Sequence, residues 1–194
     1  METPVLILAS GSPRRAHILK ELGVPFRVEV SNEDESLKPG EDGATAVERL
    51  ARAKALAVAG KAALPVLAAD TEVLCDDEIL GKPAGEAEAR AMLRRLSGRS
   101  HEVVTGVCLV DGRGAHSGVE RSRVTLAELS DDEVAWYVGT GEPLDKAGGY
   151  NIQGRGALFI ETIEGSPSNV AGLPVRLVRQ LAHEAGLDLG WPRS

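Results

Sequence analysis

Short apolar runs and longer amphipathic stretches alternate along this chain. Continuous apolar runs bounded by turn residues are typical of buried strands, which we expect at 5–9, 26–30, 66–71, 101–110, 118–126 and 157–163. The glycine-rich segment 111–114 predicts a hairpin between the two longest of these runs. A shorter hairpin is expected where 73–75 and 79–80 flank Asp76-Asp77.

Amphipathic stretches predict helices between these strands. Apolar residues recur at helical spacing over 14–22, 45–58, 86–96, 131–138 and 175–185. Gly23 and Gly98 are suited to ending the first and third of these helices. A capping box at Ser130-Asp-Asp-Glu133 starts the fourth. Helices interleaved with strands and hairpins predict an α/β fold with a mixed sheet.

The first strand ends at Ser10-Gly-Ser-Pro-Arg-Arg15, which predicts a turn and then the start of a helix. Ser12 suits the N-cap and Pro13 the first helical position, where the missing N–H of proline leaves nothing unpaired. Free backbone N–H groups at such a helix end favour an anion. Arg14 and Arg15 lie at the wrong end for the helix dipole. Either a bound polyanion offsets that mismatch, or the two arginines are simply solvated.

Other charged residues occur where the pattern predicts buried positions or turns. Lys54 lies on the apolar stripe of the predicted helix 45–58, so it either snorkels to the edge or points into a cleft. Asp70 lies at the end of the predicted strand 66–71, and Lys82 lies in the break Gly81-Lys82-Pro83. Each has an alternative interpretation as a turn carboxylate or a loop charge, and the acidic cluster 33–35 as a solvated edge.

Composition excludes several functional classes. A formal net charge of −7 and only 3% aromatic residues argue against a sequence-independent nucleic-acid binder or an anionic-membrane binder. The four histidines are scattered, and neither a nucleophile-elbow motif nor a dinucleotide-binding glycine motif occurs. Cys75 and Cys108 are expected to be reduced packing residues. Without a recognisable signal segment, a cytoplasmic location is expected.

Together these charged groups predict a phosphate-ester hydrolase. Cations would hold and neutralise phosphates, while carboxylates would hold a hard divalent metal and activate water. Magnesium suits this chemistry, because it binds through one or two carboxylates together with substrate phosphates.

Segments spread over most of the chain resemble the Maf family of nucleoside triphosphate pyrophosphatases, also called septum-formation inhibitor proteins. The segments that carry the resemblance are Leu8–Arg15, Ala69–Thr71, Gly81–Pro83, Leu96–Gly98, His101–Gly106, Asp145–Gly148 and Ile152–Gly154. They span nearly the whole chain in the order expected for the family.

This resemblance implies a fold and a reaction. The fold would be α/β, with an elongated central mixed sheet flanked by helices and two lobes with a cleft, as in ITPases, and residues 1–194 would form one Maf-like domain. The reaction would be hydrolysis of a nucleoside triphosphate to the monophosphate and pyrophosphate, dependent on Mg²⁺ or Mn²⁺. Asp145-Lys-Ala-Gly148 and Ile152-Gln-Gly154 are similar to the branch that acts on dTTP and UTP. A house-cleaning role on modified pyrimidine nucleotides is compatible with that similarity.

The resemblance also implies roles for individual residues. Asp70 would be the proton acceptor, with Lys54 and Lys82 beside it in the catalytic set. The metal would be held by Asp70 and by one residue of the acidic cluster, best matched by Asp34. Substrate-binding positions fall on Ser10, Arg14, Arg15, Thr71 and Gln153, of which Arg14, Thr71 and Gln153 are tied to substrate choice.

The sequence differs from the dTTP/UTP branch at three positions, and two other functions are considered. Asn151 stands where the branch usually has glycine, Gly149 where it usually has alanine, and Pro167 replaces a common aromatic residue. These differences concern pyrimidine preference rather than catalysis. The alternatives are a non-catalytic nucleotide-binding regulator of septum formation and a pyrophosphatase for non-standard purine nucleotides. A homodimer is possible.

Overall fold

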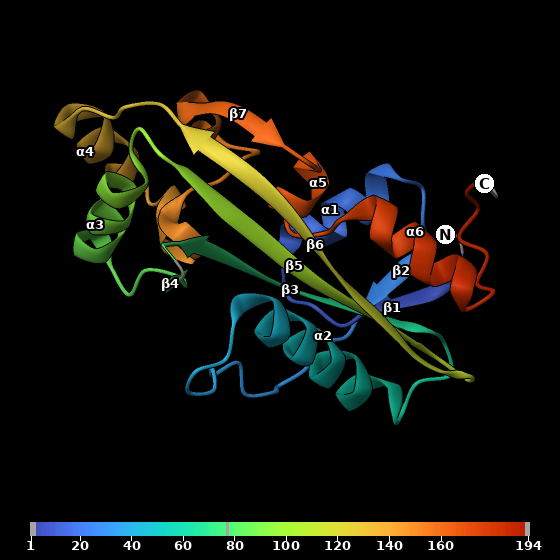
Figure 1. Cartoon of the computed structure of the whole chain (residues 1–194). Coiled ribbons are helices and arrows are strands. Elements are labelled where there is room, and N and C mark those ends of the chain that lie inside the picture. Colours follow the sequence, from blue (N-terminus) through green and yellow to red (C-terminus); the bar gives the residue numbers. More distant parts are fainter. Residues whose placement is uncertain (1–2, 77, 193–194) are drawn as a thin grey trace. The chain divides into compact units, whose positions relative to one another are not determined.

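The computed structural model describes residues 3–76 and 78–192, whose elements are drawn in Figure 1. These residues form two compact units. The first contains residues 3–70, 105–120 and 172–192, and the second contains 71–76, 78–104 and 121–171.

The strands form a mixed sheet, as predicted. They are β1 (Leu6–Leu8), β2 (Phe26–Val28), β3 (Val66–Cys75), β4 (Glu78–Leu80), β5 (Ser100–Asp111), β6 (Gly114–Leu126) and β7 (Ile160–Glu164). Their hydrogen-bonded order is β2-β1-β3-β5-β6-β7, with β4 paired to β3. Strand β1 is parallel to β2 and β3, whereas β4 and β7 are antiparallel to their neighbours. Three strands, β3, β5 and β6, contribute residues to both units.

In the first unit, helices cover both faces of the strands. Helix α2 (Gly43–Ala59) lies on one face, and α1 (Pro13–Glu21) and α6 (Val175–Glu184) lie on the other (Figure 1). The α2 side is packed with small and β-branched residues, which bring the helix close to the strands: Ile7, Ala9, Ala51, Ala55, Val66 and Ala68. Helix α2 begins two residues before the predicted start at Thr45, because Asp42 caps it by accepting from the Ala44 and Thr45 N–H groups.

The second unit packs short helices around a separate apolar cluster. Its helices are α3 (Glu86–Leu96), α4 (Asp131–Gly139) and α5 (Pro167–Val170), with 3₁₀ turns η1 (Glu142–Asp145), η2 (Ala147–Gly149) and η3 (Arg155–Phe159). The cluster includes Val73, Leu93, Tyr137 and Phe159. The Tyr137 and Phe159 rings meet edge to face at 5.3 Å between centroids.

Other details also differ from the predicted elements. Strand β3 continues through Asp70 to Cys75 rather than ending at 71. Strand β7 starts at Ile160 rather than 157, because residues 155–159 form η3, and β6 starts at Gly114 rather than 118. The single turn α5, capped by the Ser166 hydroxyl, lies in a segment predicted as loop. The short hairpin is confirmed by the antiparallel pairing of β3 with β4. Asp77 of its predicted turn lies outside the described residues. None of the helices described is long and apolar enough to span a bilayer.

Candidate active site

The turn between β1 and α1 is organised by the buried hydroxyl of Ser10. Its Oγ accepts from the Ser12 N–H at 3.2 Å and from Arg15 Nη1 at 3.1 Å. Ser12 is the N-cap and Pro13 the first helical residue, as predicted, but within the described chain the Ser12 side chain makes no capping hydrogen bond. The start of this helix is therefore stabilised by the Ser10 hydroxyl rather than by the side chain of its N-cap residue, Ser12.

Arg15 is held by hydrogen bonds and lies within the electrostatic influence of two carboxylates. Besides Ser10, its guanidinium donates through Nε to the Gly172 carbonyl at 2.8 Å. Burial lowers the pKa of Arg15, while the negative charges of Asp70 and Glu35 act to raise it. The carboxylates, which belong to the same unit, thus offset part of the cost of placing this arginine at a helix N-terminus.

Lys54 and Asp70 form a buried ion pair. Alternation along β3 places Asp70 on the same face as Val66 and Ala68, the face that α2 covers. Lys54 lies on the buried stripe of α2, and its Nζ is 2.5 Å from Asp70 Oδ1. Only 6% of Lys54 and 7% of Asp70 is exposed, so the lysine does not snorkel to solvent.

The close approach of α2 to β5 depends on Gly106. A β-carbon at this position would lie 2.3 Å from the Val47 carbonyl oxygen of α2, a distance that no side chain tolerates. The helix that carries Lys54 therefore rests directly on the backbone of β5.

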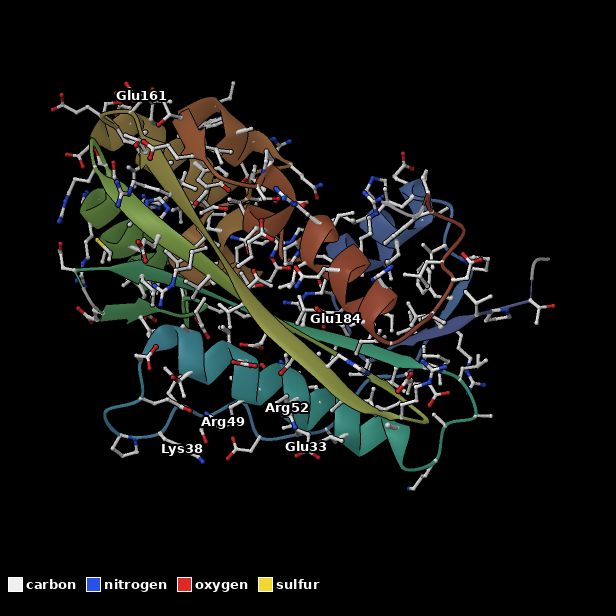
Figure 2. The ribbon with its side chains drawn as sticks, turned by 45° about the vertical axis from the view of Figure 1, so that its right-hand side comes forward. Glu33, Lys38, Arg49, Arg52, Glu161 and Glu184 are labelled. Carbon is white, nitrogen blue, oxygen red and sulfur yellow. The ribbon has the colours of Figure 1, made fainter. Side chains whose placement is uncertain are left out.

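The acidic cluster places Glu35 beside Lys54. Glu35 Oε1 is 2.7 Å from Lys54 Nζ, so one ammonium contacts the carboxylates of both Glu35 and Asp70. Asp34 instead accepts from Ser36, through its N–H at 2.9 Å and its hydroxyl at 2.7 Å. These hydrogen bonds lower the pKa of Asp34. The cluster lies on the loop that runs along α2, where Figure 2 labels Glu33 and Lys38.

These carboxylates suit a cation that takes only part of its coordination from protein. Among residues 3–76 and 78–192, no group of three or more His, Cys, Asp or Glu side chains is arranged to hold a metal ion. Glu35 and Asp70 do meet at one ammonium. Magnesium commonly binds through one or two carboxylates, keeping waters and substrate phosphates as its other ligands. The donor set therefore fits a metal that arrives with a polyphosphate.

In the second unit, Lys82 is exposed and follows β4 on a segment that is hydrogen-bonded to the Asp145–Gly148 loop. The Gly81 carbonyl accepts from the Gly148 N–H at 3.1 Å. Gly148 has a φ of +69°, and a β-carbon there would lie 3.0 Å from the Val73 side chain of β3. Two of the segments that carry the family resemblance are thus joined through their glycines.

Gln153 and Thr71 are the other predicted substrate-binding residues in this unit. Gln153 is exposed, and its N–H donates to Asn151 Oδ1 at 3.2 Å. Thr71 follows Asp70 directly in β3 and is half-buried. Arg14, in the first unit, lies in the first turn of α1 beside Arg15.

Comparison with known proteins identifies close relatives. A family model described as Maf-like protein matches residues 5–185. A dTTP/UTP pyrophosphatase of Anaeromyxobacter sp. (strain Fw109-5) is 50% identical over 191 residues, covering 96% of this chain and 92% of that protein. Proteins with the same name from Myxococcus xanthus and Deinococcus radiodurans are each 49% identical, and the matches cover 98% and 95% of this chain and 97% and 95% of those proteins.

Solved structures show the same type of fold at low identity. A HAM1 protein from Coxiella burnetii superposes with a TM-score of 0.51 at 17% identity, covering 95% of this chain and 99% of that one. The Ham1 protein of Staphylococcus aureus also gives 0.51, at 13% identity, covering 93% and 98%. These similarities concern the fold alone and agree with an α/β protein built on a mixed sheet.

Proposed function

The chain belongs to the Maf family, and on that premise we propose that it is a nucleoside triphosphate pyrophosphatase that hydrolyses dTTP and UTP. The proposal is supported by relatives at about half identity over nearly their full length, which carry the name dTTP/UTP pyrophosphatase. The observation that carries it is the buried Lys54–Asp70 pair, which Glu35 joins. A structural protein gains little from a buried lysine and a buried aspartate, because removing these two charges from water is costly.

In the proposed mechanism Asp70 accepts the proton of the attacking water. The water oxygen forms a bond to the α-phosphorus, the bond from that phosphorus to the bridging oxygen breaks, and pyrophosphate leaves with the electron pair. Lys54 orients the Asp70 carboxylate through its 2.5 Å contact. Phosphoryl chemistry of this kind mainly needs positioning and electrostatic stabilisation.

Cationic and hydroxyl groups would hold the triphosphate. We assign Arg15 and Ser10 to the phosphates, because Ser10 and the Gly172 carbonyl hold the guanidinium in one orientation. Lys82 is assigned to the charge that develops on the leaving pyrophosphate. Its assignment rests on the family resemblance.

We assign the divalent metal, Mg²⁺ or Mn²⁺, to Asp70 together with the acidic cluster. Asp34 is the residue best matched by resemblance, whereas Glu35 is the one that contacts Lys54 beside Asp70. When bound, the metal would neutralise phosphate charge and favour ionisation of water. Variants at Asp34 and Glu35 would separate the two assignments by the metal concentration needed for half-maximal rate.

Base choice is assigned to Gln153, with Arg14 and Thr71. Uracil and thymine present an acceptor, a donor and a second acceptor along one edge, which an amide side chain can pair with.

We further propose that residues 1–194 act as one Maf-like domain, because β3, β5 and β6 contribute residues to both units. We also propose that the protein acts in the cytoplasm. The two cysteines, both buried and free, agree with a reducing compartment. A homodimer stays a prediction, which light scattering would test.

A product panel tests the proposed function. Purified protein is incubated with dTTP, UTP, CTP, ATP, GTP, ITP and modified pyrimidine triphosphates, with Mg²⁺ or Mn²⁺, and the phosphate products are separated. We expect monophosphate and pyrophosphate, formed fastest from dTTP and UTP and lost on chelation of the metal. Preference for ITP would favour the purine alternative. Binding without turnover would favour the regulator.

A further inference from the structure

A single carboxylate in the second unit holds the segment that contains Gln153. Glu142, the first residue of η1, accepts from the Arg155 N–H at 3.1 Å through Oε2 and from the Gly156 N–H at 3.1 Å through Oε1. The Tyr137 hydroxyl donates to the same Oε1 at 2.8 Å. One half-buried side chain therefore satisfies two backbone N–H groups and one buried hydroxyl, an arrangement that fixes a loop.

The hydroxyl of Tyr137 passes this constraint to the other end of the loop. Tyr137 is fully buried, and its oxygen accepts from the Asn151 N–H at 3.0 Å. The Asn151 side chain in turn accepts from the Gln153 N–H at 3.2 Å, a contact that glycine at position 151 could not make. A continuous set of hydrogen bonds thus runs from Glu142 to the backbone of Gln153.

Two glycines make room for these contacts. A β-carbon at Gly156 would lie 2.6 Å from the Tyr137 hydroxyl oxygen, and one at Gly154 would lie 2.5 Å from a Glu142 carboxylate oxygen. The glycine-rich character of the loop is therefore explained by close approach to Glu142 and Tyr137.

The network keeps Glu142 ionised. Burial acts to raise the pKa of Glu142, but the hydrogen bonds from Arg155, Gly156 and Tyr137 outweigh it and leave the pKa below its ordinary value. A charged carboxylate makes stronger hydrogen bonds to backbone N–H groups than a neutral amide does.

We propose that Glu142 is the residue that positions Gln153 for recognition of the pyrimidine base. It acts through Tyr137 and Asn151, and the inference rests on the proposed function. Asn151, one of the three positions at which the resemblance implies a departure from the branch, adds the last hydrogen bond and strengthens the positioning. In this proposal Glu142 acts on the loop rather than directly on the nucleotide, so its loss should weaken base discrimination rather than the chemical step.

The test compares Glu142→Gln with wild type in the full-length protein. We measure kcat and KM for dTTP and for CTP, whose amino group breaks the acceptor–donor–acceptor pattern. A base contact present in both ground and transition states appears in KM. We expect KM for dTTP to rise about tenfold at nearly unchanged kcat, as loss of a charge-assisted hydrogen bond implies, with CTP kinetics unaltered. Glu161→Gln, at an exposed carboxylate of β7 labelled in Figure 2, is the matched control and should change neither.

Tyr137→Phe is the second variant, and it carries the test if Glu142→Gln does not fold. It keeps the ring that packs on Phe159 and removes only the hydroxyl, so it should shift the dTTP-to-CTP ratio in the same direction. Amide exchange should speed up at Gln153 in Tyr137→Phe and in Asn151→Gly. Unchanged discrimination in folded Tyr137→Phe, or an equal loss of kcat on both nucleotides, overturns the inference. Failure of wild type to release pyrophosphate from any nucleotide overturns the proposed function instead.

Discussion

Replacing Asp70 by asparagine separates the chemistry of the buried pair from its structural role. The side-chain shape is retained, and an amide oxygen can still accept from Lys54, which is 2.5 Å from the present carboxylate. The ammonium also keeps Glu35 at 2.7 Å, so it is not left without a counter-charge. The substitution removes the basic oxygen and one negative charge, including the charge that Asp70 would offer the metal, and leaves the packing of the side chain in place.

The expected magnitudes follow from this geometry. Loss of a general base costs roughly a hundredfold to ten-thousandfold in kcat. The free energy of unfolding should fall by only about 1–2 kcal/mol, the cost of weakening a charged hydrogen bond. Lys54→Met is the matched contrast. It removes the cation that both Asp70 and Glu35 contact, and breaking a buried pair in this way costs about 3–5 kcal/mol.

The assay pairs steady-state pyrophosphate release with urea unfolding of the same protein samples. Asp70→Asn should lose turnover while still binding dTTP, and it should unfold near the wild-type midpoint. Wild-type turnover in Asp70→Asn would refute the assignment of Asp70 as the base. An Asp70→Asn protein that is as unstable as Lys54→Met would show that the pair is mainly structural.

Two further predictions concern stability. Gly106→Ala should lower the free energy of unfolding by about 2 kcal/mol and reduce turnover. The new β-carbon would collide with the Val47 carbonyl and displace the helix that carries Lys54. An unchanged urea midpoint and an unchanged rate would contradict this prediction. Burial lowers the pKa of His101 to about 4, so the unfolded chain binds an extra proton as pH falls below about 6.5 and stability should drop by about 3 kcal/mol by pH 4. His101→Gln should flatten that part of the pH profile, whereas exposed His183→Gln should leave it unchanged.

Much of the fold was predictable because buried positions recur along the sequence at the spacing of a helix or a strand. The apolar run before Ser10 and the stripe that contains Lys54 each identified an element whose core face the structure confirms. The start of α2 was missed because Asp42 caps a helix whose first residue is glycine. The 3₁₀ turn at 155–159 was missed because its start is held by Glu142, a contact that no local pattern encodes.

The candidate site was predictable in part for similar reasons. A lysine on an apolar stripe needs a counter-charge, and Asp70 in a predicted buried strand was available. That strand was expected to end at 71, but it continues to Cys75, so Asp70 lies in its middle. The choice within the acidic cluster depended on a loop without periodicity. In that loop the Ser36 hydroxyl donates to the Asp34 carboxylate, while the Glu35 carboxylate forms an ion pair with Lys54. Only the folded loop distinguishes these neighbours.

The most direct test of the account follows the oxygen of water into the products. Wild-type protein is turned over on dTTP with the divalent metal in ¹⁸O-labelled water, and the products are analysed by mass spectrometry. Attack at the α-phosphorus, with Asp70 as the base, predicts one labelled oxygen in the thymidine monophosphate and none in the pyrophosphate. Label in pyrophosphate or orthophosphate would contradict the proposed reaction.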